Sequence, residues 1–142
     1  MLCREIMHRH ISTARESDEV RSVAGTMRDE NIGFVPVLDE GGVVVGVVTD
    51  RDIVVRACVG IADPRRVLVG SMMSRAVISC RPTDGVETAE RRMREHRISR
   101  LLVIDDDGAL AGVISLSDIA QYDSPGRVGR TLQAIAERKY AF

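Results

Sequence analysis

This sequence is poor in aromatic residues and almost devoid of lysine. Its 142 residues include no Trp, two Phe and two Tyr, although 44% are hydrophobic. A buried core must therefore be built from Val, Ile, Leu, Met and Ala, which suits layers of sheet and helix. Twenty basic residues, all but one of them Arg, nearly balance 21 acidic residues, for a formal net charge of −1. This balance excludes the general positive field typical of proteins that bind nucleic acid or anionic membranes.

Cysteine and long apolar runs are also scarce. Cys3, Cys58 and Cys80 are odd in number and match no metal-ligand spacing, so we predict neither a disulfide framework nor a metal site. The longest apolar run, residues 43–48, is far too short to span a membrane. The first residues lack the apolar stretch of a signal peptide. These absences predict a cytoplasmic protein without a membrane partner.

An internal repeat is the dominant pattern. When the chain is shifted by 66 positions, residues 7–53 align with residues 73–119 without gaps. The identical pairs include Met7 with Met73, Asp18 with Asp84, Val37 with Val103, Gly46 with Gly112, and Asp52 with Asp118. These matches recur at the same structural landmarks in both copies, so the chain contains two copies of one unit.

Each copy has the pattern of strand, helix, strand, strand, helix. Apolar residues at helical spacing predict a first helix around residues 20–27 and 86–93, with Ser17-Asp18 and Thr83-Asp84 as N-cap candidates. Two short apolar runs separated by a Gly-containing turn then predict a β-hairpin. These runs cover residues 34–38 and 43–48 in the first copy, and residues 100–104 and 109–114 in the second copy. Thr49 and Ser115 open the last helix of each copy.

One copy is too small to bury both faces of its sheet, so we expect the copies to pack together with their sheets facing inward. The predicted class is α/β (α+β), with tandem β-α-β-β-α repeats. The expected ranges are 1–60 for the first repeat, 61–70 for a connector, 71–121 for the second repeat and 122–142 for a helical tail. In the tail, four apolar residues are spaced like one face of a helix that ends near Phe142: Val128, Leu132, Ile135 and Ala136.

The most informative motif is Gly-apolar-apolar-Thr/Ser-x-x-Asp, which closes each copy at residues 46–52 and 112–118. One interpretation is a capping box, in which the hydroxyl and the carboxylate satisfy amides at a helix start. Another is a ligand site, in which free amides and an Asp bind a polar ligand such as a ribose. The Gly would then allow the ligand to approach the backbone closely. The motif alone leaves both interpretations open.

The tandem of these units resembles the cystathionine β-synthase (CBS) domain pair, or Bateman module, and the likeness covers nearly the whole chain. It implies a pseudo-two-fold pair that binds an adenosine-type nucleotide in a cleft between the repeats. Thr49 and Asp52 would face ribose in one site, and Ser115 and Asp118 in the other. The implied ligand is AMP, ADP or ATP, with S-adenosylmethionine or NAD as alternatives and no permanently bound cofactor.

The resemblance also suggests residues around the base and the phosphates. Thr13, Ser79 and Pro36 would line the adenine pocket, although core packing explains such residues equally well. Arg51 would reach a phosphate or pair with an acidic neighbour.

A basic cluster distinguishes the second copy. The segment 95–105 resembles the one with which kinase-regulating family members contact nucleotide phosphate, so His96, Arg97 and Arg100 are candidate phosphate contacts. The alternative is a solvated helix end, where cations favour the helix dipole. Leu102 departs from the family pattern because it stands where Pro36 stands in the first copy.

The predicted function is therefore a regulatory, ligand-sensing module, and the alternative is a ligand-free dimeric scaffold that docks on a protein partner. The sequence has no nucleophile elbow or phosphate loop, so we predict no enzyme. The resemblance implies a homodimer, for which five apolar helical residues could provide the surface: Ile53, Val54, Ala57, Ile119 and Ala120.

Overall fold

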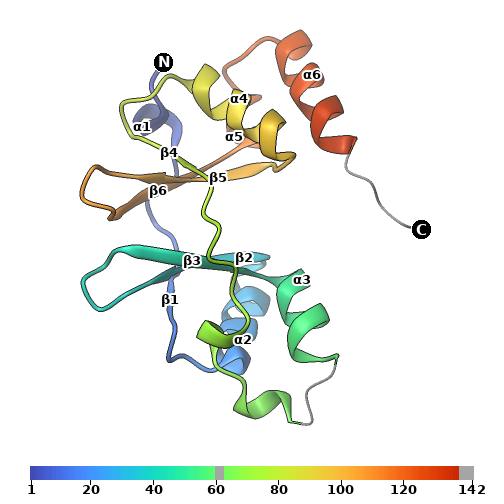
Figure 1. The fold of residues 1–142 in the computed structure, drawn as a ribbon. Coiled ribbons are helices and arrows are strands. Elements are labelled where there is room, and N and C mark those ends of the chain that lie inside the picture. Colours follow the sequence, from blue (N-terminus) through green and yellow to red (C-terminus); the bar gives the residue numbers. More distant parts are fainter. Residues whose placement is uncertain (60–62, 138–142) are drawn as a thin grey trace. The chain divides into compact units, whose positions relative to one another are not determined.

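The computed structural model describes residues 1–59 and 63–137, with the side chain of Pro64 also left aside, and it divides the chain into two compact units (Figure 1). The first-repeat unit is Ile11–Val77. The second-repeat unit combines Met1–His10 with the chain from Ile78 onward. Each unit contains one three-stranded sheet with helices on one side of it (Figure 1), which confirms the mixed α+β class.

The first-repeat unit is built around the sheet order β1-β2-β3. Its strands are β1 (Ala14–Arg15), β2 (Phe34–Leu38) and β3 (Val44–Thr49). Its helical elements are α2 (Val20–Glu30), α3 (Asp50–Asp52), the π-helical η1 (Ile53–Ala57), and the 3₁₀ turns η2 (Pro64–Arg66) and η3 (Val69–Ser71). The turns η2 and η3 occupy half of the expected connector, of which residues 61 and 62 lie outside the described part.

The second-repeat unit repeats this plan with the sheet order β4-β5-β6. Its strands are β4 (Ser79–Cys80), β5 (Arg100–Ile104) and β6 (Leu110–Ser115). Its helices are α1 (Cys3–Ile6), α4 (Val86–His96), α5 (Leu116–Ile119) and α6 (Pro125–Ala136). The two predicted hairpins are present, with Gly42 and Gly108 at φ +83° and +85° in their turns. Both glycines hold a left-handed conformation that is unfavourable for other residues.

The strand register is the same in both sheets. Pro36 lies opposite Val47, and Leu102 lies opposite Val113 at the corresponding position. The replacement of Pro by Leu therefore leaves the backbone register of the second repeat unchanged.

The predicted N-caps of the first helices are wrong. Helix α2 begins after Glu19 and α4 after Gly85, and neither residue caps through its side chain. Asp18 instead accepts a hydrogen bond from the backbone N–H of Arg15 (2.9 Å), and Asp84 does the same for Arg81 (2.8 Å). Both carboxylates thus close the turn before the helix, which satisfies local amides in the same way that a cap would.

Each unit is completed by a segment that precedes the other repeat in the sequence. Residues 1–10, which we call the N-terminal arm, lie along the edge strand β6, where the N–H and C=O groups of His8 bond those of Val113 at 2.8 and 2.9 Å. Residues 72–74 lie along β3 in the same way, with Ser74 bonded to Val47 at 2.8 and 2.9 Å. The compact units therefore divide the chain differently from the ranges that the repeat suggested, and the edge strands β3 and β6 are both covered.

The glycine of the repeated motif is explained by this arrangement. A Cβ added at Gly112 would lie 2.7 Å from the carbonyl oxygen of His8, and one at Gly46 would lie 2.7 Å from that of Ser74. Such contacts are too close for any side chain. These glycines thus admit a crossing backbone segment of the protein itself, whereas the sequence suggested the approach of a ligand.

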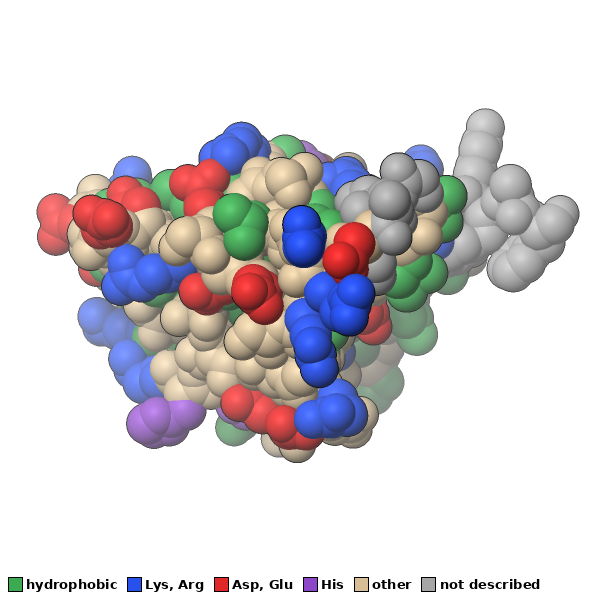
Figure 2. Space-filling view, turned by 90° about the horizontal axis from the view of Figure 1, so that it is seen from below, with side chains coloured by type: hydrophobic (Ala, Val, Ile, Leu, Met, Phe, Trp, Pro, Cys, Tyr) green, Lys and Arg blue, Asp and Glu red, His purple; other side chains and the backbone are tan. Residues whose placement is uncertain are grey.

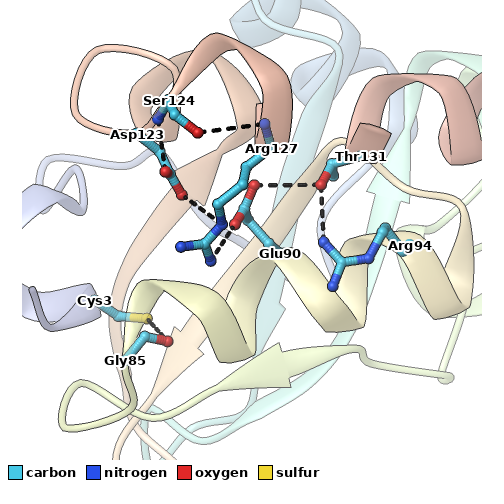
Figure 3. A network of polar contacts seen from close by, with 8 residues as sticks. All are labelled: Cys3, Gly85, Glu90, Arg94, Asp123, Ser124, Arg127 and Thr131. Carbon is cyan, nitrogen blue, oxygen red and sulfur yellow. Dashed lines mark hydrogen bonds and ion pairs between the residues drawn. The ribbon is translucent and has the colours of Figure 1, made fainter. Parts of the chain in front are cut away.

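The tail helix α6 docks on α4 through a buried polar network (Figure 3). The fully buried Glu90 carboxylate accepts hydrogen bonds from Arg127 and Thr131, both at 3.2 Å. Arg94 also donates to the Thr131 hydroxyl, at 2.9 Å. A buried charge is tolerated only when it is paired in this way.

The expected face of this helix is partly wrong. Thr131 and Ile135 are buried, whereas Leu132 is 56% exposed. The helix begins at Pro125 after the N-cap Ser124, and residues 138–142 lie outside the described part, including the expected end near Phe142.

On the face shown in Figure 2, basic and acidic side chains lie interspersed, in keeping with the balanced net charge. Two of the five residues expected on a dimer surface, Ala57 and Ile119, are buried inside their own units, so they cannot serve there. Val54 is 60% exposed and is available. Within the described residues, no helix combines the length and apolarity needed to cross a bilayer.

Candidate ligand-binding site

The two Thr/Ser-x-x-Asp motifs form capping boxes with nearly identical geometry. Thr49 accepts a hydrogen bond from the Asp52 amide (3.1 Å), while its own amide donates to Asp52 Oδ2 (3.0 Å). Ser115 and Asp118 make the same two bonds at 3.2 and 2.8 Å. The capping interpretation is therefore correct for both motifs, and any ligand must bind to boxes that are already closed.

The Asp52 and Asp118 carboxylates differ in which of their oxygen atoms remain free to accept a hydrogen bond. Asp118 Oδ2 also accepts the Ser115 hydroxyl at 2.6 Å, and Oδ1 lies 2.8 Å from Nε2 of His8. Asp52 Oδ1 has a weaker neighbour, the Arg56 guanidinium, at 3.8 Å. Asp52 thus has an oxygen available for a ligand hydroxyl, whereas a ligand at Asp118 must share that oxygen with His8 or displace it.

The environment of Asp118 also changes its acidity. Burial raises the pKa of this carboxyl, but hydrogen bonds from Ser115 and His8, together with the charge of His8, outweigh burial. The net result is a pKa below the ordinary value for Asp. The carboxylate is therefore ionised at neutral pH and can accept hydrogen bonds from a ribose.

His8 is the residue of this candidate site that the sequence did not identify as a ligand contact. It belongs to the N-terminal arm, 110 positions from Asp118, and its side chain is 70% exposed. The corresponding residue beside the first-repeat sheet is Ser74. The 66-residue repeat aligns His8 with Ser74, but only the crossing of the first segment onto β6 shows that His8 meets Asp118.

The basic cluster of the second repeat lies at the same end of the sheet as its capping box. Arg100 is the first residue of β5 and lies opposite Ser115 in the ladder. His96 ends α4, and Arg97 follows as its C-cap. All three side chains are exposed, and none makes a hydrogen bond or ion pair with the described residues. The structure thus brings Arg100 to the ribose candidate and leaves the three side chains available to an anion.

Arg97 has an unusual backbone. Its φ is +54°, which matches the left-handed conformation of Asn31 at the end of α2 (φ 54°). Asn adopts this conformation readily, whereas Arg does so at some energetic cost. Strained residues often cluster at functional sites, and this one carries a free cation.

The remaining candidates are more dispersed. Thr13 is exposed and precedes β1, Pro36 is buried within β2, and Ser79 is half-buried in β4. The backbone carbonyl of Ser79 accepts a hydrogen bond from Arg92 at 2.7 Å. Arg51 is exposed in the first turn of α3. These four residues stay predictions as ligand contacts.

The model of the CBS domain matches residues 3–57 and 69–124. The chain belongs to the CBS domain family. This confirms the resemblance that the repeat and the Thr/Ser-x-x-Asp motifs suggested, and the two matched ranges correspond to the two copies.

Several relatives share the architecture of this CBS pair. It is 31% identical to the CBS domain-containing protein YhcV of Bacillus subtilis, over 82% of this chain and 81% of YhcV. It is 26% identical to Hypoxic response protein 1 of Mycobacterium tuberculosis, over 84% of this chain and 82% of that protein. A Methanopyrus kandleri protein, MK0525, is 29% identical over 84% of this chain, which spans only 61% of its length. The homoserine O-acetyltransferase of Methanococcoides burtonii matches over only 22% of its length.

Two solved structures agree with the fold. The CBS domain protein TA0289 of Thermoplasma acidophilum superposes with a TM-score of 0.83, at 22% identity, over 99% of this chain and 79% of that one. The CBS domain pair of protein MJ0100 gives a TM-score of 0.74 at 26% identity, over 85% of this chain and 94% of that one. The MJ0100 structure contains 5′-methylthioadenosine and S-adenosyl-L-methionine.

Proposed function

We propose that this CBS pair is a regulatory module that binds an adenosine-containing ligand at its Thr/Ser-x-x-Asp boxes. The observation that carries the proposal is the position of Arg100 opposite Ser115, which puts a free cation beside a hydroxyl–carboxylate pair. Ribose requires such acceptors, and a phosphate or another anionic group requires the cation. MJ0100, a structural neighbour, holds two adenosine-containing ligands.

The two boxes are unequal sites in this proposal. The second repeat offers His96, Arg97 and Arg100 to phosphate, so it favours AMP, ADP or ATP. The first repeat offers the freer Asp52 oxygen but has Glu30, Asn31 and Phe34 where the second has basic residues, so it suits a ligand without phosphate. The position of the ligand in a cleft between the repeats stays a prediction.

Thermal denaturation with a panel of ligands tests the proposal. The panel consists of AMP, ADP, ATP, S-adenosylmethionine, 5′-methylthioadenosine and NAD, each titrated to saturation. A ligand at 100 times its Kd stabilises the folded state by about 2.7 kcal/mol, which gives a clear rise in Tm. If no member of the panel raises the Tm, the proposal is wrong.

Asp→Asn variants then locate the site. Asp52→Asn and Asp118→Asn keep an oxygen that can accept the hydrogen bond from the amide of the capping box, but they remove the negative charge of the carboxylate. We expect the variant at the occupied site to bind at least tenfold more weakly, or about 1.4 kcal/mol. Asp105→Asn is the matched control, because Asp105 lies in the turn at the other end of the same hairpin and accepts its amides. Equal affinity in all three variants would remove the ribose assignment.

The phosphate assignment has its own test. An Arg97→Ala, Arg100→Ala double variant should bind ATP and AMP more weakly than the wild type does, while its affinity for adenosine should be unchanged. Unchanged AMP affinity in that variant would move the phosphate contact elsewhere.

A ligand-independent scaffold is the second candidate, and the exposed valines of the first-repeat unit favour it. Val54, Val55 and Val59 are 60%, 49% and 70% exposed, close to a groove of about 190 Å³ that Ile53 and Cys58 help to line. Exposed apolar residues of this kind are typical of protein contact surfaces. Sedimentation of the wild type and of Val54→Asp, Val55→Asp at micromolar concentration tests this. A wild-type homodimer that becomes monomeric in the double variant supports the scaffold function. A wild-type protein that is already monomeric contradicts it.

A further inference from the structure

Two cysteines that are far apart in the sequence meet in the second-repeat unit. Cys3 lies in α1 and Cys80 in β4, and their sulfur atoms are 3.7 Å apart although 77 positions separate them. Both side chains are buried, with 0% and 3% of their surface exposed. The Cys3 thiol also lies 3.7 Å from the carbonyl oxygen of Gly85 (Figure 3). Cys58, by contrast, is exposed in the other unit.

The N-terminal arm that carries Cys3 is docked by backbone hydrogen bonds and by the buried side chains of Cys3, Ile6 and Met7. The amides of Cys3 and Arg4 donate to the carbonyl oxygens of Asp84 (2.8 Å) and Pro82 (3.0 Å), and the amide of Val86 donates to Met1 (3.1 Å). Helix α1 has only four residues, so it has little stability of its own. Arms of this kind open locally far more often than a whole domain unfolds. Such opening would admit a small reagent to both sulfur atoms.

The two thiols are chemically unequal because they share a hydrogen bond. The Cys80 thiol donates to the Cys3 sulfur, which lowers the pKa of Cys3, and the same bond together with burial raises the pKa of Cys80. Cys3 is thus the better nucleophile and Cys80 the resolving thiol. The short separation of the sulfur atoms supplies the geometry for this reaction, in which they approach from 3.7 Å to the bonding distance of about 2.05 Å.

We propose that Cys3 and Cys80 are a reversible disulfide pair that locks the N-terminal arm onto the second-repeat unit. The oxidant is a low-molecular-weight disulfide. The Cys3 thiolate attacks one of its sulfur atoms and releases a thiolate, which leaves a mixed disulfide on Cys3. Cys80 then loses its proton and attacks the Cys3 sulfur, so that the second small thiolate leaves. In total two protein thiols become one protein disulfide, and the small disulfide is reduced to two thiols.

The lock has a defined structural consequence. The bond closes a loop of 77 positions, and long loops lose the most freedom in the unfolded chain when they are cross-linked. It also prevents the opening of the arm, while leaving the fold of the first-repeat unit unchanged. The oxidised protein should therefore be more resistant to unfolding and to proteolysis within the arm.

The test uses the full chain with Cys58→Ser, which removes the exposed thiol at a position where Ser is easily accommodated. After incubation with oxidised glutathione, we expect the count of free thiols in denaturant to fall from two to none, without a glutathione adduct. Trypsin digestion without reductant should yield residues 1–4 joined to residues 76–91, because Arg81 precedes Pro82 and is not cleaved. The Tm should rise by roughly 5 °C or more, and dithiothreitol should reverse every change.

Two control variants keep the result interpretable. Cys3→Ser with Cys58→Ser removes the proposed nucleophile, so its Tm should be the same with and without oxidant. Cys80→Ser with Cys58→Ser keeps Cys3 but removes the resolving thiol, so it should retain glutathione as a mixed disulfide. Two outcomes would overturn the proposal. One is a Cys58→Ser protein that keeps both thiols free, and the other is one that forms disulfides only between chains.

Discussion

The two repeats share a backbone plan but differ in what surrounds their carboxylates. In the second repeat, Asp118 is held by Ser115 and by His8 from the N-terminal arm, and its helix α4 carries a buried Glu90. In the first repeat, the corresponding positions are Asp52, Ser74 and Ala24. The hydrogen bonds of the capping boxes are thus duplicated, whereas the contact of His8 with Asp118 and the bonds of Glu90 with α6 belong to the second-repeat unit. The two repeats therefore share their backbone arrangement and differ in the polar side chains that it carries.

The largest predicted difference lies at Glu90. Glu90→Ala gives the second repeat the residue of the first, and it leaves the Arg127 guanidinium and the Thr131 hydroxyl without their shared acceptor. Breaking a buried pair in this way is expected to lower the free energy of unfolding by about 3 kcal/mol, measured by urea denaturation. Glu95→Ala is the control, since its ion pair with Arg91 is exposed and contributes less than about 0.5 kcal/mol. If both variants lose the same amount, the network does not dock α6.

The crossing segments give the next largest effect. Gly46→Ala and Gly112→Ala each force a Cβ against a backbone carbonyl, and overpacking of this kind lowers stability by about 1–3 kcal/mol. Gly46→Ala should lower the stability more than Gly112→Ala does. Residues 73–74 are held by the chain on both sides, whereas the N-terminal arm can move aside. Gly129→Ala, in a helix with open space around it, should instead stabilise by about 0.5–1 kcal/mol. If neither Gly46→Ala nor Gly112→Ala lowers the free energy of unfolding, the backbone segments do not cross these glycines as described.

The left-handed residues allow a reciprocal exchange. Arg97→Asn should raise the free energy of unfolding by about 1 kcal/mol, and Asn31→Arg should lower it by a similar amount. Chemical denaturation of the two variants measures both signs. We expect Arg97→Asn to bind phosphate-bearing ligands more weakly in spite of its greater stability. A destabilised Arg97→Asn protein would show that the side chain of Arg97 stabilises the fold.

The smallest effect is the acid dependence at Asp118. Its pKa is lowered in the folded state, so its contribution to stability is present above the ordinary Asp value of about 3.9 and is lost as the pH falls through the lower folded value. The stability advantage of the wild type over Asp118→Asn should therefore shrink by about 0.5 kcal/mol as the pH falls below 4. His8→Gln should show part of this loss. An advantage that grows as the pH falls below 4 would reverse the assignment.

Local patterns predicted much of this structure. Hydrophobic spacing, turn glycines and the Thr/Ser-x-x-Asp boxes located both hairpins and the helices that follow them, because these features depend on neighbours a few residues apart. The same reasoning placed N-caps at Asp18 and Asp84, where a carboxylate closes a turn just before the helix. Such residues satisfy amides within three positions in either arrangement, so the sequence does not distinguish the two.

Long-range contacts explain what the sequence did not predict. Glu90 looks like a solvated residue on a charged helix until α6 covers it. His8 lies in a segment without an obvious role until that segment reaches β6. Ala57 and Ile119 are apolar residues in the same predicted helices as the dimer-surface candidates such as Val54. Only their packing shows that they belong to the cores of their own units.

The crossing of the N-terminal arm has a consequence for synthesis on the ribosome. The first-repeat unit is a continuous stretch, Ile11–Val77, and can fold as soon as that stretch has emerged. Residues 1–10 are made before that stretch, yet His8 pairs with Val113 of β6, which is made more than a hundred residues later. Until then the apolar side chains of Ile6 and Met7 have no core to enter. Residues 1–10 must therefore stay undocked until β6 has been made, and a chaperone that binds short apolar segments would have its target there.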